Sequence, residues 1–350
     1  AETYEGFGLY EQAMRHAWRA VEIRDADGAP GGPQSLQSQA LIGLLCYRLG
    51  DYDEAEHQLR GTLEAQRRLL GDDHGDVAWS AVRLSWVLIE QGRYGDAEPI
   101  LGDVLARQRR VLGNDHRDTA TTLNSLAVLY ADQQRYGEAE ALHSEVLAIR
   151  SRVLGPSDPD TLKSMTNLAV VSFYQGRYDD AAALFSEVLE IQTETLGADH
   201  PVTLSSANNL AVIYERQGRL ADAETLHRRA LEAKIRVLGE DHPETLSSRY
   251  NLAILLTSQG RLDQADRLHR ETLAVRRLVL GHSHPSTLDS ICAVAGVAAR
   301  RGDRDEALRG LREAVDLGYR DADSLLQDAD FVATDAWLIV LDEPTNHFDL

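Results

Sequence analysis

The stretch Leu196–Leu204 reads Leu-Gly-Ala-Asp-His-Pro-Val-Thr-Leu, and its landmarks recur along the chain at a fixed offset. Its loop glycine belongs to a column with a spacing of 42 residues: Gly71, Gly113, Gly155, Gly197, Gly239 and Gly281. Its histidine keeps the same interval, with an aspartate in one place: His74, His116, Asp158, His200, His242 and His284. Self-similarity at such a period indicates an array of repeats rather than two or three globular domains.

Each repeat carries the pattern of two helices. A column of alanines has the same period: Ala55, Ala97, Ala139, Ala181, Ala223, Ala265 and Ala307. Apolar residues follow a helical period in two blocks, Leu204–Tyr214 and Ala223–Ile235. A tight turn at Gln217–Arg219 separates them, and Asp199 or His200 is placed to cap the first helix. The sequence therefore predicts an all-α fold with two antiparallel helices in each repeat.

The repeat pattern also predicts how the chain is divided. Residues 1–24 match the second helix of a partial repeat, so we expect the chain to begin inside a larger array. Residues 25–320 are expected to form seven units, at about 29–70, 71–112, 113–154, 155–196, 197–238, 239–280 and 281–320. Residues 321–335 have the character of a capping segment, and residues 336–350 have a different character again.

Composition restricts the classes of partner. The formal net charge is -20, which argues against nucleic acid because binding phosphates needs a basic surface. No apolar run is long enough to span a membrane, and the start of the chain has no export signal. Cys46 and Cys292 are separated by several repeats, so a reducing compartment is expected. These observations together predict a cytoplasmic protein, and the arginine-rich, lysine-poor usage is typical of a GC-rich bacterial genome.

The repeat resembles the tetratricopeptide repeat (TPR) over about residues 10–320. The residues that carry this resemblance are Leu-Ala…Tyr in the first helix and Ala…Ala in the second. The sequence Leu-Gly-x-Asp-His-Pro-x-Thr-Leu and the run Asn208–Ala211 are similar to the kinesin light chain type. The resemblance implies a right-handed solenoid that binds proteins without catalysis. It also implies peptide ligands in which tryptophan or leucine stands beside acidic residues.

The resemblance implies a concave groove lined by the first helices. One row of groove positions would be Val82, Asn124, Thr166, Asn208 and Tyr250, and the next would be Trp86, Val128, Val170, Val212 and Ile254. Further contributions would come from Trp79, Glu90, Asp132, Phe173, Tyr174 and Arg216. Among these, Asn124 and Asn208 are expected to hold the backbone of a peptide by hydrogen bonds.

Other repeated polar and aromatic residues are expected to serve the fold. The asparagine column Asn167, Asn209 and Asn251 is assigned to hydrogen bonds inside the array, and Trp79 and Trp86 are assigned to packing. The loop histidines lie one repeat apart, too far to bind one metal ion together. No constellation for nucleophilic catalysis stands out, and no cofactor or metal is expected.

The last fifteen residues resemble the Walker B and D-loop sequence of ABC ATPases, most closely the ABC-F type. The resemblance implies that Asp342 would help to hold magnesium, Glu343 would polarise water and His347 would belong to a switch. The chain has two lysines, Lys163 and Lys234, and neither follows a phosphate-binding glycine loop, so we expect no ATP hydrolysis.

The tail leaves three alternatives open. It is a functionless extension, the edge of a longer protein with an ATPase domain, or a ligand that places Trp337 in a groove of this or another molecule. We expect a non-catalytic scaffold that binds a peptide or partner segment. The alternatives are a regulatory segment of a larger signalling NTPase and, third, a fragment of an ABC-type ATPase.

Overall fold

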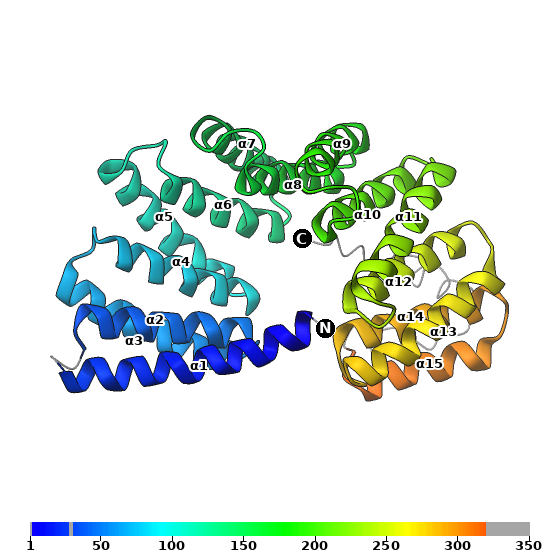
Figure 1. Ribbon diagram of the computed structural model, residues 1–350, viewed down its shortest axis with the longest axis horizontal. Helices are drawn as coiled ribbons and strands as arrows, with labels where there is room; N and C mark the ends of the chain where they lie inside the picture. The colour runs from blue at the N-terminus through cyan, green and yellow to red at the C-terminus, as the bar shows by residue number, and fades with distance from the viewer. Residues whose placement is uncertain (1, 28–30, 320–350) are drawn as a thin grey trace. The chain divides into compact units, whose positions relative to one another are not determined.

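The computed structural model describes residues 2–27 and 31–319, and all the regular structure in these ranges is helical (Figure 1). The prediction of an all-α repeat array is therefore confirmed. The expected capping segment and the ABC-like tail lie outside the described residues. The helices are α1 (Glu2–Asp27), α2 (Pro33–Arg48), α3 (Tyr52–Leu70), α4 (Gly75–Glu90), α5 (Tyr94–Val111), α6 (Arg117–Asp132), α7 (Tyr136–Val153), α8 (Pro159–Tyr174), α9 (Tyr178–Thr195), α10 (Pro201–Arg216), α11 (Leu220–Leu238), α12 (Pro243–Ser258), α13 (Leu262–Val279), α14 (Pro285–Arg300) and α15 (Arg304–Asp316).

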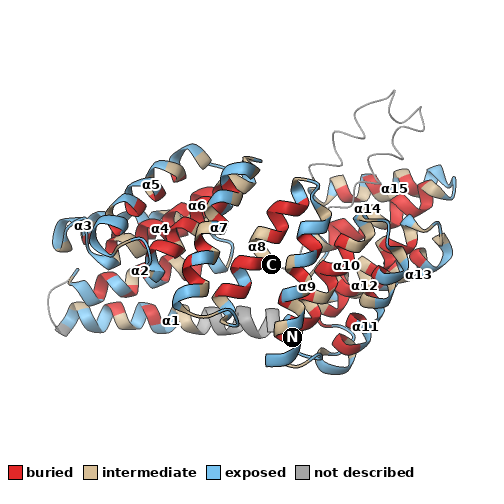
Figure 2. Ribbon diagram, turned by 90° about the horizontal axis from the view of Figure 1, so that it is seen from above, coloured by how far each residue is buried: buried red, intermediate tan, exposed pale blue. Residues whose placement is uncertain are grey.

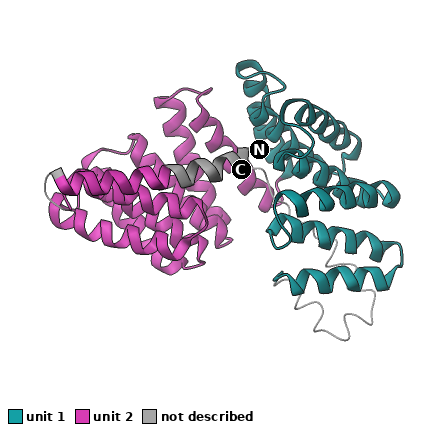
Figure 3. Ribbon diagram, turned by 60° about the horizontal axis from the view of Figure 1, so that its bottom comes forward, with its two compact units in different colours: residues 1, 178–350 teal, residues 2–177 magenta. Residues whose placement is uncertain are grey.

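The chain divides into two compact units (Figure 3). The N-terminal unit holds α1 to α8, and the C-terminal unit holds α9 to α15. Within each unit every helix packs against the next one along the chain. The first helices of successive repeats also touch, as α2 and α4 do in the N-terminal unit and α10 and α12 in the C-terminal unit. Each unit is therefore a linear stack of helix pairs.

The histidine column caps the first helices, as predicted. His200 is the N-cap of α10, and its Nδ1 atom accepts a hydrogen bond from the backbone N–H of Val202 at 3.3 Å. The same bond begins α4, α6, α12 and α14. Asp158 replaces histidine at α8 and accepts from the N–H of Asp160 at 2.9 Å. The cap satisfies a backbone donor that would otherwise lack a helical partner.

The alanine column marks the points where helices pack most closely. Each of these alanines is completely buried: Ala55, Ala97, Ala139, Ala181, Ala223, Ala265 and Ala307. Figure 2 shows that the buried residues lie where neighbouring helices face each other. A methyl side chain lets two backbones approach closely, and any larger group at these positions would have to displace the neighbouring helix.

A second column, buried except at Arg24, joins each second helix to the first helix of the next repeat. It consists of long polar side chains on the second helices: Arg24, Gln66, Gln108, Arg150, Gln192, Lys234 and Arg276. A column of hydroxyls has the same period on the following first helices: Ser38, Ser80, Thr122, Ser164, Ser206, Ser248 and Ser290. The arginines of the first column bond to theirs. Arg276 donates to Ser290 Oγ at 2.8 Å, whereas Gln108 Oε1 and Thr122 Oγ1 have no hydrogen-bond partner. Arg276 therefore bonds to the hydroxyl of its junction, whereas Gln108 and Thr122 do not bond to each other.

Candidate functional site

One first helix of the N-terminal unit, α4, carries an arginine between two tryptophans. Trp79, Arg83 and Trp86 are all on α4, and their spacing places them on one face of the helix. The guanidinium carbon of Arg83 lies 4.5 Å from the centre of the Trp79 ring and 4.2 Å from that of Trp86. A cation at this distance from an indole face is attracted by the electrons of the ring.

Trp86 is held in place by both neighbouring first helices. Its Nε1 atom donates to Ser125 Oγ on α6 at 2.9 Å, and its ring lies 6.2 Å from that of Tyr47 on α2. The Tyr47 hydroxyl in turn donates to the carboxylate of Glu90 at 3.2 Å. These contacts fix the orientation of the indole, so Arg83 stacks on a rigid surface.

The charge of Arg83 is poorly compensated. No carboxylate in the described part of the chain lies within ion-pair distance of its guanidinium, and its Nε atom is buried without a hydrogen-bond partner. Partial burial and the nearby charge of Arg48 lower the pKa of Arg83 to about 10, against the opposing influence of Asp118. Arg83 remains charged at neutral pH, and a carboxylate placed beside it would remove part of the cost of burying it.

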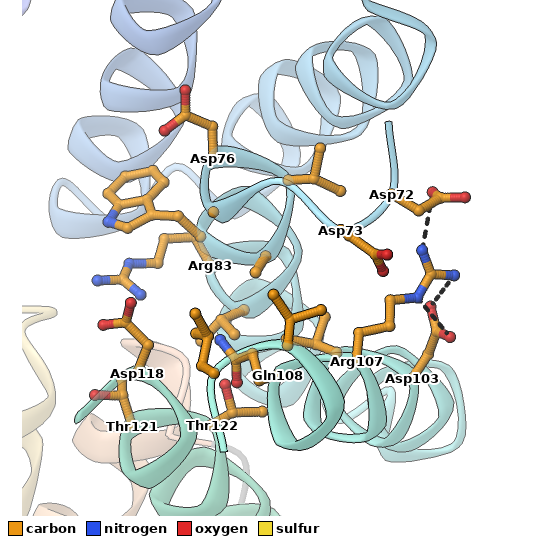
Figure 4. A pocket seen from close by; sticks show the side chains of 18 of the residues that line it. Asp72, Asp73, Asp76, Arg83, Asp103, Arg107, Gln108, Asp118, Thr121 and Thr122 are labelled. Carbon is orange, nitrogen blue, oxygen red and sulfur yellow. Dashed lines mark hydrogen bonds and ion pairs between the residues drawn. The ribbon is translucent and has the colours of Figure 1, made fainter. Parts of the chain in front are cut away.

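A cavity of about 550 Å³ adjoins this cluster, between α4, α5, the start of α6 and the loop before α4 (Figure 4). Arg83 and Asp118 lie at one side of it, and Arg107 lies at the other. Arg107 forms ion pairs with Asp72 at 3.2 Å and Asp103 at 2.9 Å. The carboxylates of Asp72 and Asp103 on this side of the cavity are therefore already paired with a cation.

Besides Arg83 Nε, the cavity wall contains two unsatisfied polar atoms. They are Gln108 Oε1 and Thr122 Oγ1, on residues that are 7% and 0% exposed. Buried polar atoms of this kind cost free energy unless they are hydrogen-bonded. The feature of the cavity that can bind a ligand is therefore the positive charge of Arg83 in its wall.

The predicted groove residues of the N-terminal unit differ in accessibility. Trp86 and Asn124 are half-buried, Val128 and Tyr174 are exposed, and Val170 and Phe173 are buried. The Asn124 amide oxygen accepts from Asn167 Nδ2 at 2.9 Å, so these two asparagines bond to each other between α6 and α8. This bond agrees with the structural role expected for Asn167. Tyr174 stacks on Tyr136 with ring centres 5.7 Å apart.

In the C-terminal unit, Asn208 lies in the interior. Its side chain is 0% exposed, its amide nitrogen donates to Ser248 Oγ, and its amide oxygen lies 3.1 Å from His227 Nδ1. The other ring nitrogen of His227 lies 2.8 Å from a carboxylate oxygen of Glu215. The expectation that Asn208 holds a peptide is therefore corrected, because both of its polar atoms are engaged inside the array.

The other predicted groove residues of the C-terminal unit differ in how far they are buried. Val212 is buried, Arg216 is exposed, and Tyr250 and Ile254 are half-buried. Tyr250 lies edge-on to His269, with ring centres 5.4 Å apart, and burial raises its pKa. The most accessible of these predicted groove side chains is thus Arg216.

Sequence reasoning missed Arg83. Its column contains Ser125, Asn167, Asn209 and Asn251 in the following repeats, so the column as a whole indicated a structural role. The available signal was the exception itself: one arginine placed between two tryptophans at helical spacing. Trp79 and Trp86 were assigned to packing, and their half-buried rings leave surface for a ligand as well.

No group of three histidine, cysteine or acidic side chains among the described residues could hold a metal ion. None of the described helices combines the length and the apolar character that crossing a membrane requires.

A protein-family model matches most of the chain. The model of the tetratricopeptide repeat matches residues 34–110, 87–152, 118–194, 160–235, 206–277 and 250–318. Comparison with curated proteins finds no match.

Solved structures show similar arrays. A crystal structure from Podosopora anserina, described as kinesin light chain nearly identical TPR-like repeats, is 27% identical with a TM-score of 0.52, covering 58% of this chain and 97% of that one. BtubC (BKLC) from P. vanneervenii is 20% identical with a TM-score of 0.57, covering 67% and 94%. Yeast Tom70 is 15% identical with a TM-score of 0.58, covering 98% and 62%. The last two likenesses concern the fold alone.

Proposed function

Because the chain belongs to the tetratricopeptide repeat family, we propose that it is a non-catalytic interaction scaffold whose N-terminal unit binds an acidic segment of a partner protein. One observation carries this proposal. Arg83 is stacked between two indole rings and has no carboxylate at ion-pair distance among the described residues. Arginines that are enclosed by aromatic rings at a surface are typical anchors of protein interfaces.

The electrostatics favour a negative ligand at this point. The chain carries a net charge of -20, yet on successive first helices Arg48 lies near enough to Arg83 for its charge to contribute to the lowered pKa of Arg83. A carboxylate held by Arg83 would be partly shielded from water, where a charge-assisted hydrogen bond is stronger than at an open surface. The local positive charge would also attract acidic segments that the rest of the surface repels.

The indole rings supply the apolar part of the recognition. Trp79 and Trp86 are half-buried, so each retains ring surface beside the guanidinium. A leucine or tryptophan next to the ligand carboxylate would cover that surface. This combination agrees with the ligand type that the resemblance to kinesin light chain repeats implies.

Of the groove residues predicted from the sequence, we keep those of the N-terminal unit with accessible surface. Asn124, Val128 and Tyr174 would contact a longer ligand that continues past Trp86 along the first helices. Asn208 is left out because it is buried. The alternatives that involve an ATPase domain, or Trp337 as a groove ligand, rest on residues outside the described part of the chain.

The expected cytoplasmic location remains part of this proposal. It rests on the sequence. In the structure Cys46 is a buried thiol, and burial raises its pKa to about 11. Such a thiol is protonated at neutral pH and reacts slowly with oxidants.

Titration calorimetry with a short acidic probe tests the proposal. The probe is acetyl-Asp-Trp-Glu-Leu-Asp-Ala-amide, and its twin carries asparagine and glutamine in place of the acids. We expect the acidic peptide to bind at least tenfold more tightly, and its affinity to fall as salt is raised from 50 to 500 mM, on the scale of charge screening. Equal affinities for the two peptides, or no binding of either, would overturn it.

A further inference from the structure

Ion pairs join the turns of successive repeats. In four repeats the arginine of the turn binds a glutamate that lies 37 residues earlier, on the second helix of the preceding repeat. The pairs are Arg93 with Glu56 at 2.8 Å, Arg135 with Glu98 at 3.2 Å, Arg177 with Glu140 at 2.6 Å, and Arg261 with Glu224 at 2.7 Å. The array thus repeats one acid–base contact along its length.

Arg219 occupies the same position in its turn, but the residue in the place of the glutamate is Ala182. Among the described residues the carboxylate within ion-pair distance of Arg219 is Asp222 of its own turn, at 2.7 Å. The guanidinium lies over the ring of Tyr214 at 3.8 Å, as that of Arg135 does over Tyr130. The Arg219 side chain is 48% exposed, compared with 34–42% for the four paired arginines. This junction therefore keeps the arginine and lacks its inter-repeat acid.

The glutamine two residues before Arg219 also lacks a contact that the paired turns have. In the paired turns the glutamine oxygen accepts from the turn arginine, as Gln133 does from Arg135 at 2.9 Å and Gln259 from Arg261 at 3.0 Å. The corresponding oxygen, Gln217 Oε1, is buried and has no partner. Without a glutamate to position it, Arg219 does not reach this acceptor.

A cavity of about 660 Å³ opens beside Arg219, between the second helices α9 and α11, which are neighbours in Figure 1. It begins at Ser186, one helical turn beyond Ala182, and Leu189, Leu210 and Leu226 line it. On α9, Glu190 and Glu194 supply acidic groups to its wall. The cavity thus combines an incompletely paired cation, an apolar lining and an acidic side.

We propose that this cavity is a second docking site, on the face formed by the second helices, for a partner segment that supplies the carboxylate missing at Ala182. The array itself identifies the chemistry of the occupant, since a glutamate fills the same place in the four paired turns. The carboxylate binds Arg219, and an apolar side chain beside it packs on Leu189 and Leu226.

The acidic side of the cavity restricts the partner further. Glu190 and Glu194 would repel a second acid at the far end of the ligand, so the segment carries a single acid and a lysine or arginine instead. This ligand differs from the polyacidic one proposed for Arg83. The two sites lie in different units, so the failure of either proposal leaves the other intact.

The test uses the labelled probe acetyl-Ala-Glu-Ala-Leu-Leu-Ala-Lys-amide and its twin with glutamine for glutamate. We expect the probe to shift the Nε–H resonance of Arg219 in the NMR spectrum of the full chain. Ala182→Glu restores the internal ion pair, and should weaken binding of the probe at least tenfold. Ala183→Glu is the matched control, because it adds the same charge at the exposed neighbouring position and should leave the affinity within twofold.

The outcomes are decisive in both directions. Ala182→Glu is expected to fold, since four other repeats carry glutamate at this position; Arg219→Ala, checked by circular dichroism, gives an independent loss of binding. The proposal is overturned if the wild-type chain shows no shift at millimolar probe, if the glutamine twin binds equally well, or if Ala182→Glu binds as tightly as the wild type.

Discussion

Arg150 on α7 donates to the hydroxyl of Ser164 on α8 at 2.9 Å, inside the N-terminal unit. The same guanidinium nitrogen donates to the backbone carbonyl of Asp160 at 3.0 Å. Arg150 is 8% exposed and Ser164 is fully buried. One long side chain therefore ties a second helix to the first helix of the next repeat, at a position where Gln66, Gln108 and Gln192 leave an oxygen without a partner.

We predict that Arg150→Gln lowers the free energy of unfolding by about 1–3 kcal/mol, the cost of losing buried charge-assisted hydrogen bonds. The fold should survive, because glutamine occupies the same column elsewhere. Chemical denaturation followed by circular dichroism measures the change. Arg152→Gln is the control: this arginine is exposed and pairs with Asp115 at the surface, so its loss should cost less than about 0.5 kcal/mol. Equal effects of the two substitutions would contradict the role given to Arg150.

Gln134 has the left-handed backbone that glycine adopts in the other turns of its column. Its φ is 60°, and the corresponding glycines include Gly92 at 72° and Gly176 at 76°. A side chain in this conformation strains the backbone, so Gln134→Gly should raise the free energy of unfolding by about 0.5–1 kcal/mol. Thermal unfolding checks this. Gln133→Gly, at φ -80°, has no such strain to relieve and should lower stability; a stabilising effect there would refute the explanation.

His143 and His269 are buried, and burial lowers their pKa values to about 4 and about 3, helped by Arg150 and Arg276 respectively. Both are neutral in the folded chain at pH 5, whereas histidine in the unfolded chain takes up a proton below about 6.5. Stability should therefore fall as pH drops from about 6.5 towards 4, by about 2 kcal/mol for each histidine at pH 5.

The column on the second helices that contains His143 and His269 provides its own control. Phe185 takes the equivalent place on α9, so phenylalanine is compatible with this position. The double variant His143→Phe and His269→Phe should lose most of the stability difference between pH 7 and pH 5, measured by urea unfolding at both values. An unchanged pH dependence would show that other groups cause it.

The repeat period was enough to predict the helix pairs, because the signals for them are local. His200 caps its helix by accepting a hydrogen bond from the backbone of a residue two positions later. Ala223 is buried at a close helix contact that its small side chain permits. These properties depend on residue type and helical spacing alone. They return in every unit, so a 42-residue comparison of the sequence with itself reveals them.

The candidate sites were hidden because they depend on departures from the columns. Arg83 has no acid at ion-pair distance among the described residues, and Ala182 leaves Arg219 with the acid of its own turn alone. Neither difference is visible until the contacts of the other repeats are known. Asn208 shows the opposite problem. Its column position implied a groove contact. In the structure its amide oxygen instead contacts His227 on α11, and the helical spacing of residues on α10 could not predict that contact.

The affinity of the acidic probe for Arg83→Ala tests the central claim most directly. Loss of a charge-assisted anchor worth about 1.5–3 kcal/mol should weaken binding by about 10- to 100-fold. Arg236→Ala, which removes an exposed arginine paired with Asp199 in the C-terminal unit, should leave the affinity unchanged. If Arg83→Ala binds the probe as tightly as the wild-type chain does, the acidic ligand does not bind at the Trp79–Arg83–Trp86 cluster.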